Sequence, residues 1–133
     1  MLPQDIEATA ESVIRRAIEA GLMIATAESC TGGLVAGALT AIAGSSAVVD
    51  RGFVTYSNEA KTEMLGVSQD VLARFGAVSE PTARAMAEGA ITHSRAQAAV
   101  SITGIAGPGG GSDEKPVGLV HFAVTAADGT IIH

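Results

Sequence analysis

The chain has 133 residues and a formal net charge of −6, from 8 basic and 14 acidic side chains. Hydrophobic residues make up 47% of the chain and charged residues 17%, which indicates a globular protein and excludes an intrinsically disordered one. This length is typical of one domain, which we expect to span residues 1–133. Because 25 residues are alanine, we expect a core of small aliphatic side chains.

The same composition excludes several classes of partner. Lysine and arginine form no cluster beyond Arg15 and Arg16, so we expect no nucleic acid to bind. The longest apolar runs, at residues 22–25 and 34–38, are far shorter than the roughly 20 residues of a membrane span. The N-terminus lacks the basic and apolar regions of a signal peptide. A single cysteine allows no internal disulfide, so a cytoplasmic location is expected.

The first half of the chain alternates helical and strand patterns. Residues 5–20 have apolar side chains at helical spacing, and Gly21 is a stop signal. Residues 22–27 are typical of a short buried strand. A helix is predicted over 31–43, just before Gly44, and a strand within 47–56. Short helices follow at 58–65 and 68–75, each with a glycine after it.

The second half predicts one longer helix and a final hairpin. Ser79 is expected to be an N-cap, with Pro81 in the first turn of a helix that reaches about His93. Residues 98–103 are predicted as a strand, and 104–116 as a glycine-rich loop. Residues 117–126 and 130 onward are expected to pair around Asp128 and Gly129. Helices that alternate with strands indicate an α/β layered domain with a mixed sheet.

A possible nucleophile lies at the first junction from strand to helix, in the segment AESCTGG at residues 27–33. A helix N-terminus presents unpaired N–H groups and the positive end of the helix dipole. Gly32 and Gly33 let a ligand approach the backbone, so the segment suits an anion or an oxyanion. Ser29 could use those donors as a nucleophile. The alternative is that Ser29, Thr31 and the glycines only cap the helix.

Cys30 is the rival nucleophile, because thiolates are activated at helix N-termini. A cysteine hydrolase normally needs a histidine partner, and His93, His121 and His133 form no motif. We therefore interpret Cys30 as a small packed side chain.

A possible base follows the predicted strand at 47–56. Lys61 falls in the first turn of the next helix, where the helix dipole disfavours a cation, and burial would lower its pKa further. A lysine that is partly neutral near pH 7 can act as a general base toward a serine hydroxyl. The alternative is a solvated surface lysine. Tyr56, the only tyrosine, lies at the strand end, which suits either the rim of the core or a site.

The loop after the strand at 98–103 contains five glycines within residues 104–111. Such a loop is conformationally costly, and cradling a phosphate with backbone N–H groups is a common reason for it. It matches neither a P-loop nor a dinucleotide-binding fingerprint, so ATP and NAD are disfavoured. No set of ligands has metal-binding spacing. We expect neither a cofactor nor a metal.

Five segments together resemble the CinA C-terminal domain family, which includes the bacterial nicotinamide-nucleotide amidohydrolases, or NMN deamidases. They are AESCTGG at 27–33, RGFVTYSNEAK at 51–61, GAVSE at 76–80, TGIAGP at 103–108 and KPVG at 115–118. The likeness covers nearly the whole chain. The family usually continues with a further strand and a long helix, which are absent from this sequence.

The resemblance implies a three-layer α/β/α sandwich around a mixed, mostly parallel sheet. It also implies hydrolysis of the carboxamide of nicotinamide mononucleotide to nicotinate mononucleotide and ammonia, in pyridine-nucleotide recycling. The catalytic serine, lysine and tyrosine of the family fall on Ser29, Lys61 and Tyr56. The expected mechanism is acyl transfer, in which Lys61, with Tyr56 as a relay, takes the proton of Ser29.

The substrate is expected to meet backbone amides and hydroxyl groups on several loops. The residues expected to bind the substrate phosphate or the oxyanion are Thr31, Gly32, Gly33, Ser45, Ser46, Thr103, Gly104, Ala106 and Gly107. Two alternatives remain, namely a catalytically silent nucleotide-binding accessory domain and a related Ser-Lys amidohydrolase or esterase with another phosphorylated substrate. We also expect a homo-oligomer, with the helical face at 82–91 as a candidate surface.

Overall fold

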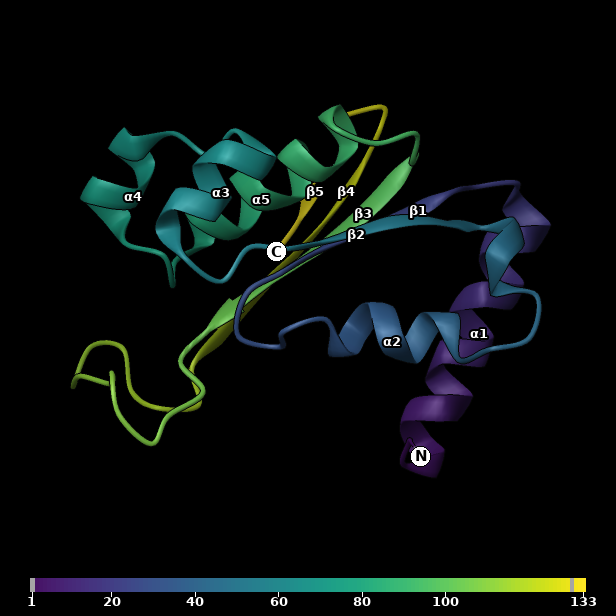
Figure 1. Ribbon diagram of the computed structural model, residues 1–133, viewed down its shortest axis with the longest axis horizontal. Coiled ribbons are helices and arrows are strands. Elements are labelled where there is room, and N and C mark those ends of the chain that lie inside the picture. The colour runs from purple at the N-terminus through teal and green to yellow at the C-terminus, as the bar shows by residue number, and fades with distance from the viewer. Residues whose placement is uncertain (1, 130) are drawn as a thin grey trace.

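A five-stranded mixed sheet separates two groups of helices in the computed structural model, which describes residues 2–129 and 131–133 (Figure 1). The helices α1 and α2 cover one face of the sheet, and α3, α4 and α5 cover the other. The three-layer α/β/α prediction is therefore confirmed. In chain order the elements are α1 (Gln4–Ala20), β1 (Ile24–Glu28), α2 (Leu34–Thr40), the 3₁₀ turn η1 (Ser45–Ala47), β2 (Val49–Val54), α3 (Asn58–Leu65), α4 (Gln69–Phe75), α5 (Glu80–Thr92), β3 (Ala98–Gly104), β4 (Val120–Ala126) and β5 (Ile131–Ile132).

The strand order is β2-β1-β3-β4-β5, and the central strand β1 runs parallel to both of its neighbours. Strand β4 is antiparallel to β3, and β5 is antiparallel to β4. At the end of β1, Glu28 pairs with Val54 of β2 and with Ile102 of β3. The carboxyl ends of the three parallel strands therefore meet at one edge of the sheet, the edge at which α/β proteins bind ligands.

The core consists of small side chains, as the composition predicts. Ten of the 18 buried hydrophobic residues in the described part of the chain are alanine. Small residues let the layers approach closely, most clearly where α5 crosses α3. A Cβ atom at Gly89 of α5 would collide with the carbonyl group of Leu65 at the end of α3. Gly89 therefore permits the contact that holds α3, and with it Lys61, against the rest of the domain.

Local signals place most of the helix ends. Gly21 and Gly66 end α1 and α3 with φ angles of 66° and 70°, in the left-handed region that glycine adopts without strain. The hydroxyl groups of Ser57, Ser68 and Ser79 each accept a hydrogen bond from a backbone N–H in the first turn of α3, α4 and α5. The predicted N-cap at Ser79 is confirmed.

Three expectations from the sequence need correction or fall outside the structure. The helix predicted at 31–43 spans only Leu34–Thr40, because Gly32 and Gly33 have φ angles of 60° and 104° and extend the preceding turn. The strand predicted at 117–126 begins at Val120. In the final hairpin the Gly129 N–H donates to the Ala126 carbonyl at 3.0 Å, while Thr130 lies outside the described residues.

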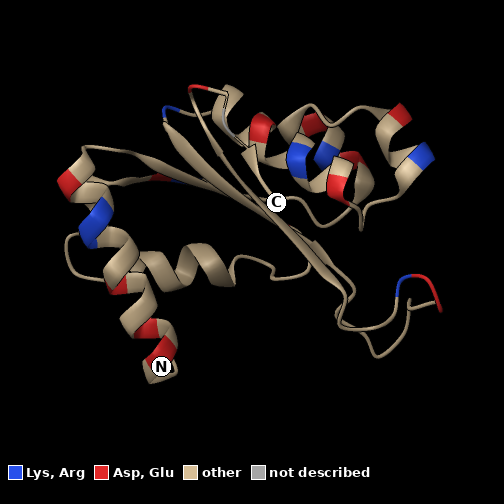
Figure 2. Cartoon of the chain, turned by 180° about the vertical axis from the view of Figure 1, so that it is seen from behind, with Lys and Arg blue, Asp and Glu red and all other residues tan. Residues whose placement is uncertain are grey.

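The helical face at 82–91 is not an open surface for self-association. Helix α5 packs on β3 and β4, and it buries Thr82, Ala83, Met86, Ala87, Gly89 and Ala90. Charged residues lie mainly on the helices, and in the part of the chain that the structure describes they form no continuous basic track (Figure 2). Within residues 2–129 and 131–133, no helix is both long and apolar enough to cross a membrane.

Candidate active site

Ser29 and Lys61 lie side by side at the carboxyl edge of the parallel strands. The Lys61 Nζ atom is 3.0 Å from the Ser29 Oγ atom, although the two residues are 32 positions apart. Lys61 is 1% exposed and Ser29 is 8% exposed. A serine hydroxyl and a buried amine at this distance can exchange a proton directly.

The parallel strands produce this contact. Ser29 directly follows β1, and its N–H donates to the Ile102 carbonyl of β3 at 2.9 Å. Thr55 directly follows β2, and its N–H donates to the Glu28 carbonyl at 2.8 Å. The chain then turns into α3, which carries Lys61 back over the strand ends. The two residues therefore meet because they follow neighbouring parallel strands.

Carbonyl oxygens surround the Lys61 amine on its other side. The Nζ atom donates to the carbonyls of Thr55 at 2.9 Å, of Tyr56 at 3.3 Å and of Ser57 at 3.5 Å. A neutral amine has two N–H bonds and one lone pair. Two of these carbonyls can accept hydrogen bonds from the two N–H groups of the neutral amine. The lone pair of the amine is then free to accept the hydroxyl proton of Ser29.

Burial lowers the pKa of Lys61 from its ordinary value of 10.5, because the charged form is poorly solvated there. The interaction with Cys30 acts in the opposite direction and is the weaker cause. The sequence argument attributed part of this pKa shift to the helix dipole. In the structure, desolvation is the main cause, and it favours the neutral amine that a general base requires.

The lowered pKa of Lys61 should appear as a pH dependence of stability. Between the folded-state pKa and 10.5, the unfolded chain binds a proton that the folded chain does not. The free energy of unfolding should therefore rise with pH through this window for the wild type relative to Lys61→Met, which lacks the amine. Denaturant unfolding of both proteins at several pH values measures the difference. Parallel pH profiles would contradict the lowered pKa.

Tyr56 contributes its backbone to the site. Its carbonyl accepts the hydrogen bond from Lys61, whereas its side chain is 75% exposed. The direct contact between Lys61 and Ser29 makes a proton relay through Tyr56 unnecessary.

Some of the backbone N–H groups expected to bind an oxyanion already donate hydrogen bonds within the protein. The N–H group of Gly33 donates to Glu28 Oε1 at 3.2 Å, and the N–H group of Gly32 donates to the Ser29 carbonyl at 3.0 Å. Among the described residues, no oxygen acceptor takes the N–H groups of Cys30 and Thr31. The Thr31 Oγ1 atom is buried and also has no partner in the described part of the chain. The N–H groups of residues 30 and 31 lie closer to Ser29 than the helix itself, and the acceptor that they share is the sulfur of Cys30.

Glu28 is the site residue that sequence reasoning missed. The motif containing it was interpreted through its serine and glycines, although an acidic side chain close before a helix is a recognised capping signal. In the structure Glu28 is fully buried beneath the turn at residues 29–33.

Cys30 has the properties of a packed side chain. It is partly buried, and burial raises the pKa of its thiol. The backbone N–H groups of Cys30 and Thr31 lower this pKa, but by less than burial raises it. Because only the thiolate is a strong nucleophile, this environment disfavours Cys30 in that role.

The glycine-rich loop reaches the same edge of the sheet. The Thr103 hydroxyl donates to the Ala77 carbonyl at 2.8 Å, and a Cβ atom at Gly104 would lie 3.1 Å from Cys30 Sγ. Ala106 and Gly107 continue this loop, and Gly107 has a φ angle of 78°. The structure therefore brings Thr103 and Gly104 next to the serine turn.

Ser45 and Ser46 are a correction to the expected substrate-binding set. They lie in η1, just before β2, whose first residue Val49 pairs with Ile24 at the start of β1. Ser29 follows the other end of β1, roughly 15 Å away at the rise of a β-strand. The Ser45 hydroxyl donates to the Thr40 carbonyl at 3.3 Å. These two serines therefore lie at the opposite end of β1 from Ser29.

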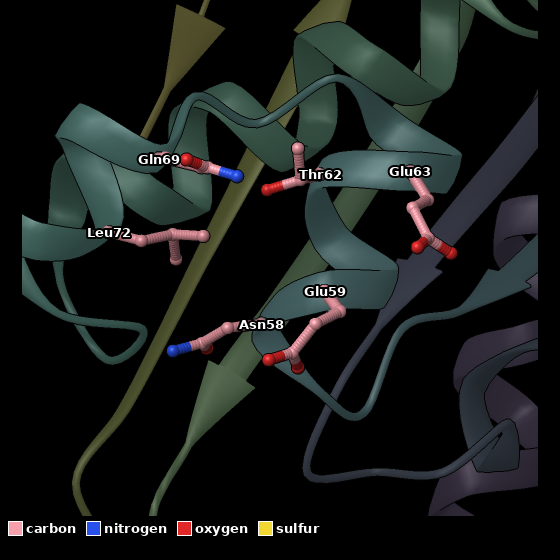
Figure 3. Close-up of a pocket in the computed structure, with 6 residues that line it drawn as sticks. All are labelled: Asn58, Glu59, Thr62, Glu63, Gln69 and Leu72. Carbon is pink, nitrogen blue, oxygen red and sulfur yellow. The ribbon is translucent and has the colours of Figure 1, made fainter.

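A separate cavity of about 300 Å³ lies between α3 and α4 (Figure 3). Its lining residues are Asn58, Glu59, Thr62, Glu63, Gln69 and Leu72. Lys61 projects from α3 into the interior instead, toward Ser29. This cavity is therefore distinct from the serine–lysine site.

Comparison with known proteins gives a consistent set of relatives. The family described as the CinA C-terminal domain matches residues 6–133. The nicotinamide-nucleotide amidohydrolase PncC of Escherichia coli K12 is 62% identical over 109 residues, which cover 82% of this chain and 66% of that protein. A CinA-like protein of Mycolicibacterium gilvum is 60% identical over 116 residues, covering 87% of this chain and 28% of that protein. The chain thus spans slightly less than two thirds of the first relative and under a third of the second.

Solved structures show the same architecture. The competence/damage inducible protein CihA of Agrobacterium tumefaciens has a TM-score of 0.98 and 63% identity, and the match covers 100% of this chain and 81% of that one. A CinA superfamily protein of Klebsiella pneumoniae has a TM-score of 0.92 and 43% identity, covering 97% of this chain and 80% of that one.

Proposed function

The chain belongs to the CinA C-terminal domain family, and on this basis we propose that it is an amidase that hydrolyses the carboxamide of nicotinamide mononucleotide to nicotinate mononucleotide and ammonia. The observation that carries the proposal is the 3.0 Å contact between Ser29 Oγ and the buried Lys61 Nζ. The similarity to a nicotinamide-nucleotide amidohydrolase supports the choice of substrate.

In the proposed reaction, Ser29 is the nucleophile and neutral Lys61 is the base. Lys61 takes the hydroxyl proton while the Ser29 Oγ atom bonds to the carboxamide carbon, which gives a tetrahedral oxyanion. The ammonium group then returns the proton to the amide nitrogen, the C–N bond breaks, and ammonia leaves. Water, deprotonated by the same amine, attacks the acyl-serine ester and releases the carboxylate with a free Ser29.

Backbone N–H groups near Ser29 are the proposed oxyanion donors. The groups of Cys30 and Thr31 suit this role, because their acceptor is the sulfur of Cys30, a weak acceptor, whereas a Glu28 oxygen already accepts from Gly33. We assign the phosphate and ribose to the neighbouring loop with Thr103, Gly104, Ala106 and Gly107, where backbone donors and small residues allow close approach.

Ammonia release from a panel of pyridine nucleotides tests the function. Nicotinamide mononucleotide should release one ammonia per nicotinate mononucleotide formed. Absence of ammonia with every substrate would indicate the silent nucleotide-binding domain. Ammonia from another phosphorylated amide, but not from nicotinamide mononucleotide, would indicate a related amidohydrolase.

The reaction is expected to proceed without added metal, because a neutral lysine activates the serine in the proposed mechanism. Turnover after dialysis against a chelator should match that of untreated enzyme, as measured by ammonia release. Strong inhibition by the chelator that zinc reverses would contradict the serine–lysine mechanism.

A further inference from the structure

Glu28 is a fully buried carboxylate with both oxygens in use. Its Oε1 atom accepts hydrogen bonds from the N–H groups of Gly33 at 3.2 Å and Val35 at 2.9 Å. Its Oε2 atom accepts one from the N–H group of Ala36 at 3.0 Å. These three donors lie at the start of α2, whereas Glu28 is the last residue of β1. The side chain therefore closes a loop around the turn at residues 29–33.

The Glu28 carboxyl group has no basic side chain as a partner in the described part of the chain. None of the ion pairs among these residues includes Glu28. Burial of a lone carboxylate is strongly unfavourable unless hydrogen bonds compensate, and the three N–H groups do so here. An apolar residue at this position would avoid that cost, so the carboxylate is not explained by core packing alone.

The backbone of Glu28 connects the same turn to the base. Its carbonyl accepts hydrogen bonds from the Thr55 N–H at 2.8 Å and from the Thr55 hydroxyl at 3.4 Å. The Thr55 carbonyl in turn accepts the hydrogen bond from Lys61 Nζ. Glu28 thus contacts the nucleophile's turn through its side chain and the strand end that orients the base through its backbone.

We propose that Glu28 is a positioning residue, whose carboxylate clamps the turn at residues 29–33 so that Ser29 Oγ stays within reach of Lys61 Nζ. This inference rests on the proposed serine–lysine mechanism. It adds a role for a residue that contacts neither the substrate nor the transferred proton. It also explains why the first amides of α2 are withdrawn from catalysis, because the clamp uses them.

Glu28→Gln tests the clamp with little change in volume. The glutamine oxygen can still accept from Gly33 and Val35, but its NH₂ group would face the N–H donor of Ala36. We expect kcat for nicotinamide mononucleotide to fall by about 10- to 100-fold with KM nearly unchanged, because a displaced nucleophile costs rate rather than binding. Glu28→Asp, one methylene shorter, should lose at least as much.

Thr26→Val is the matched control. Thr26 lies two residues earlier on the same strand face, is fully buried, and its hydroxyl has no hydrogen-bond partner among the described residues. This variant should keep kcat. Ala36→Pro is a second probe, because it removes the N–H group that donates to Oε2.

A sulfonyl fluoride modifies a reactive serine covalently, and intact-protein mass spectrometry measures the rate of this labelling. This rate reports the reactivity of Ser29 in the absence of the substrate. We expect labelling to slow in parallel with kcat in Glu28→Gln and Ala36→Pro, in protein shown to be folded by thermal melting. Unchanged labelling and kcat in folded variants would overturn the proposal, as would a rise in KM alone. If the wild type fails to deamidate nicotinamide mononucleotide but labelling still slows in Glu28→Gln, the proposed function fails and the positioning role stands.

Discussion

Replacing Ser29 by alanine is expected to lower kcat by on the order of 10⁶-fold, the loss seen when a serine hydrolase loses its nucleophile. The reason is that Ser29 Oγ lies 3.0 Å from the buried Lys61 Nζ atom. The substitution removes one oxygen at an 8% exposed position, so the fold should persist. Ammonia release by the purified variant, with its melting temperature as a folding check, measures the effect.

Cys30→Ala is the matched control for this variant. Cys30 is the adjacent residue, and burial raises the pKa of its thiol, which keeps it protonated at neutral pH. Most of the wild-type kcat should therefore remain. The reverse pattern, in which Cys30→Ala is inactive and Ser29→Ala is active, would transfer the nucleophile to the cysteine.

The second large effect is expected at Lys61. Lys61→Arg should lose about 10²- to 10⁴-fold in kcat, nearly as much as Lys61→Ala, because arginine keeps the charge but cannot act as a base. A residue that only bound phosphate would tolerate this exchange, with an effect mainly on KM. Steady-state kinetics with nicotinamide mononucleotide separate the two parameters.

The pH dependence of the wild type gives a further test of Lys61. The base must be neutral, so kcat/KM should rise with pH through an apparent pKa below 10.5, the direction that burial imposes. An arginine variant that keeps kcat and changes only KM would make Lys61 a substrate clamp. In that case the base would have to be sought elsewhere.

The sequence predicted much of this fold because many of its signals are local. Gly21 and Gly66 end helices through their own φ angles, and Ser57, Ser68 and Ser79 cap helices through N–H groups three residues away. Such hydrogen bonds depend on residues within one turn, so a pattern in the sequence reveals them. The motifs also placed Ser29 and Lys61 at a strand end and on a helix, respectively.

One error arose from the backbone conformation of two glycines, and the others arose where tertiary contacts override local patterns. Thr31 was expected to begin a helix, but the glycines after it adopt left-handed conformations and the helix starts at Leu34. Ser45 and Ser46 looked like phosphate donors, yet the parallel register of β1 and β2 places them at the opposite end of the strands from Ser29. The face at 82–91 looked available to a partner, but the sheet covers it.

The sequence by itself therefore determined the α/β class, most helix ends and the identity of the nucleophile and base as candidates, since these follow from short-range chemistry. Only the tertiary structure decided that Lys61 Nζ reaches Ser29 Oγ, that burial lowers the pKa of the amine, and that Glu28 occupies the first amides of α2. These features depend on residues brought together from separate strands, and on the water excluded between them. The spacing of residues along the chain shows neither which residues from separate strands meet nor how far water is excluded from them.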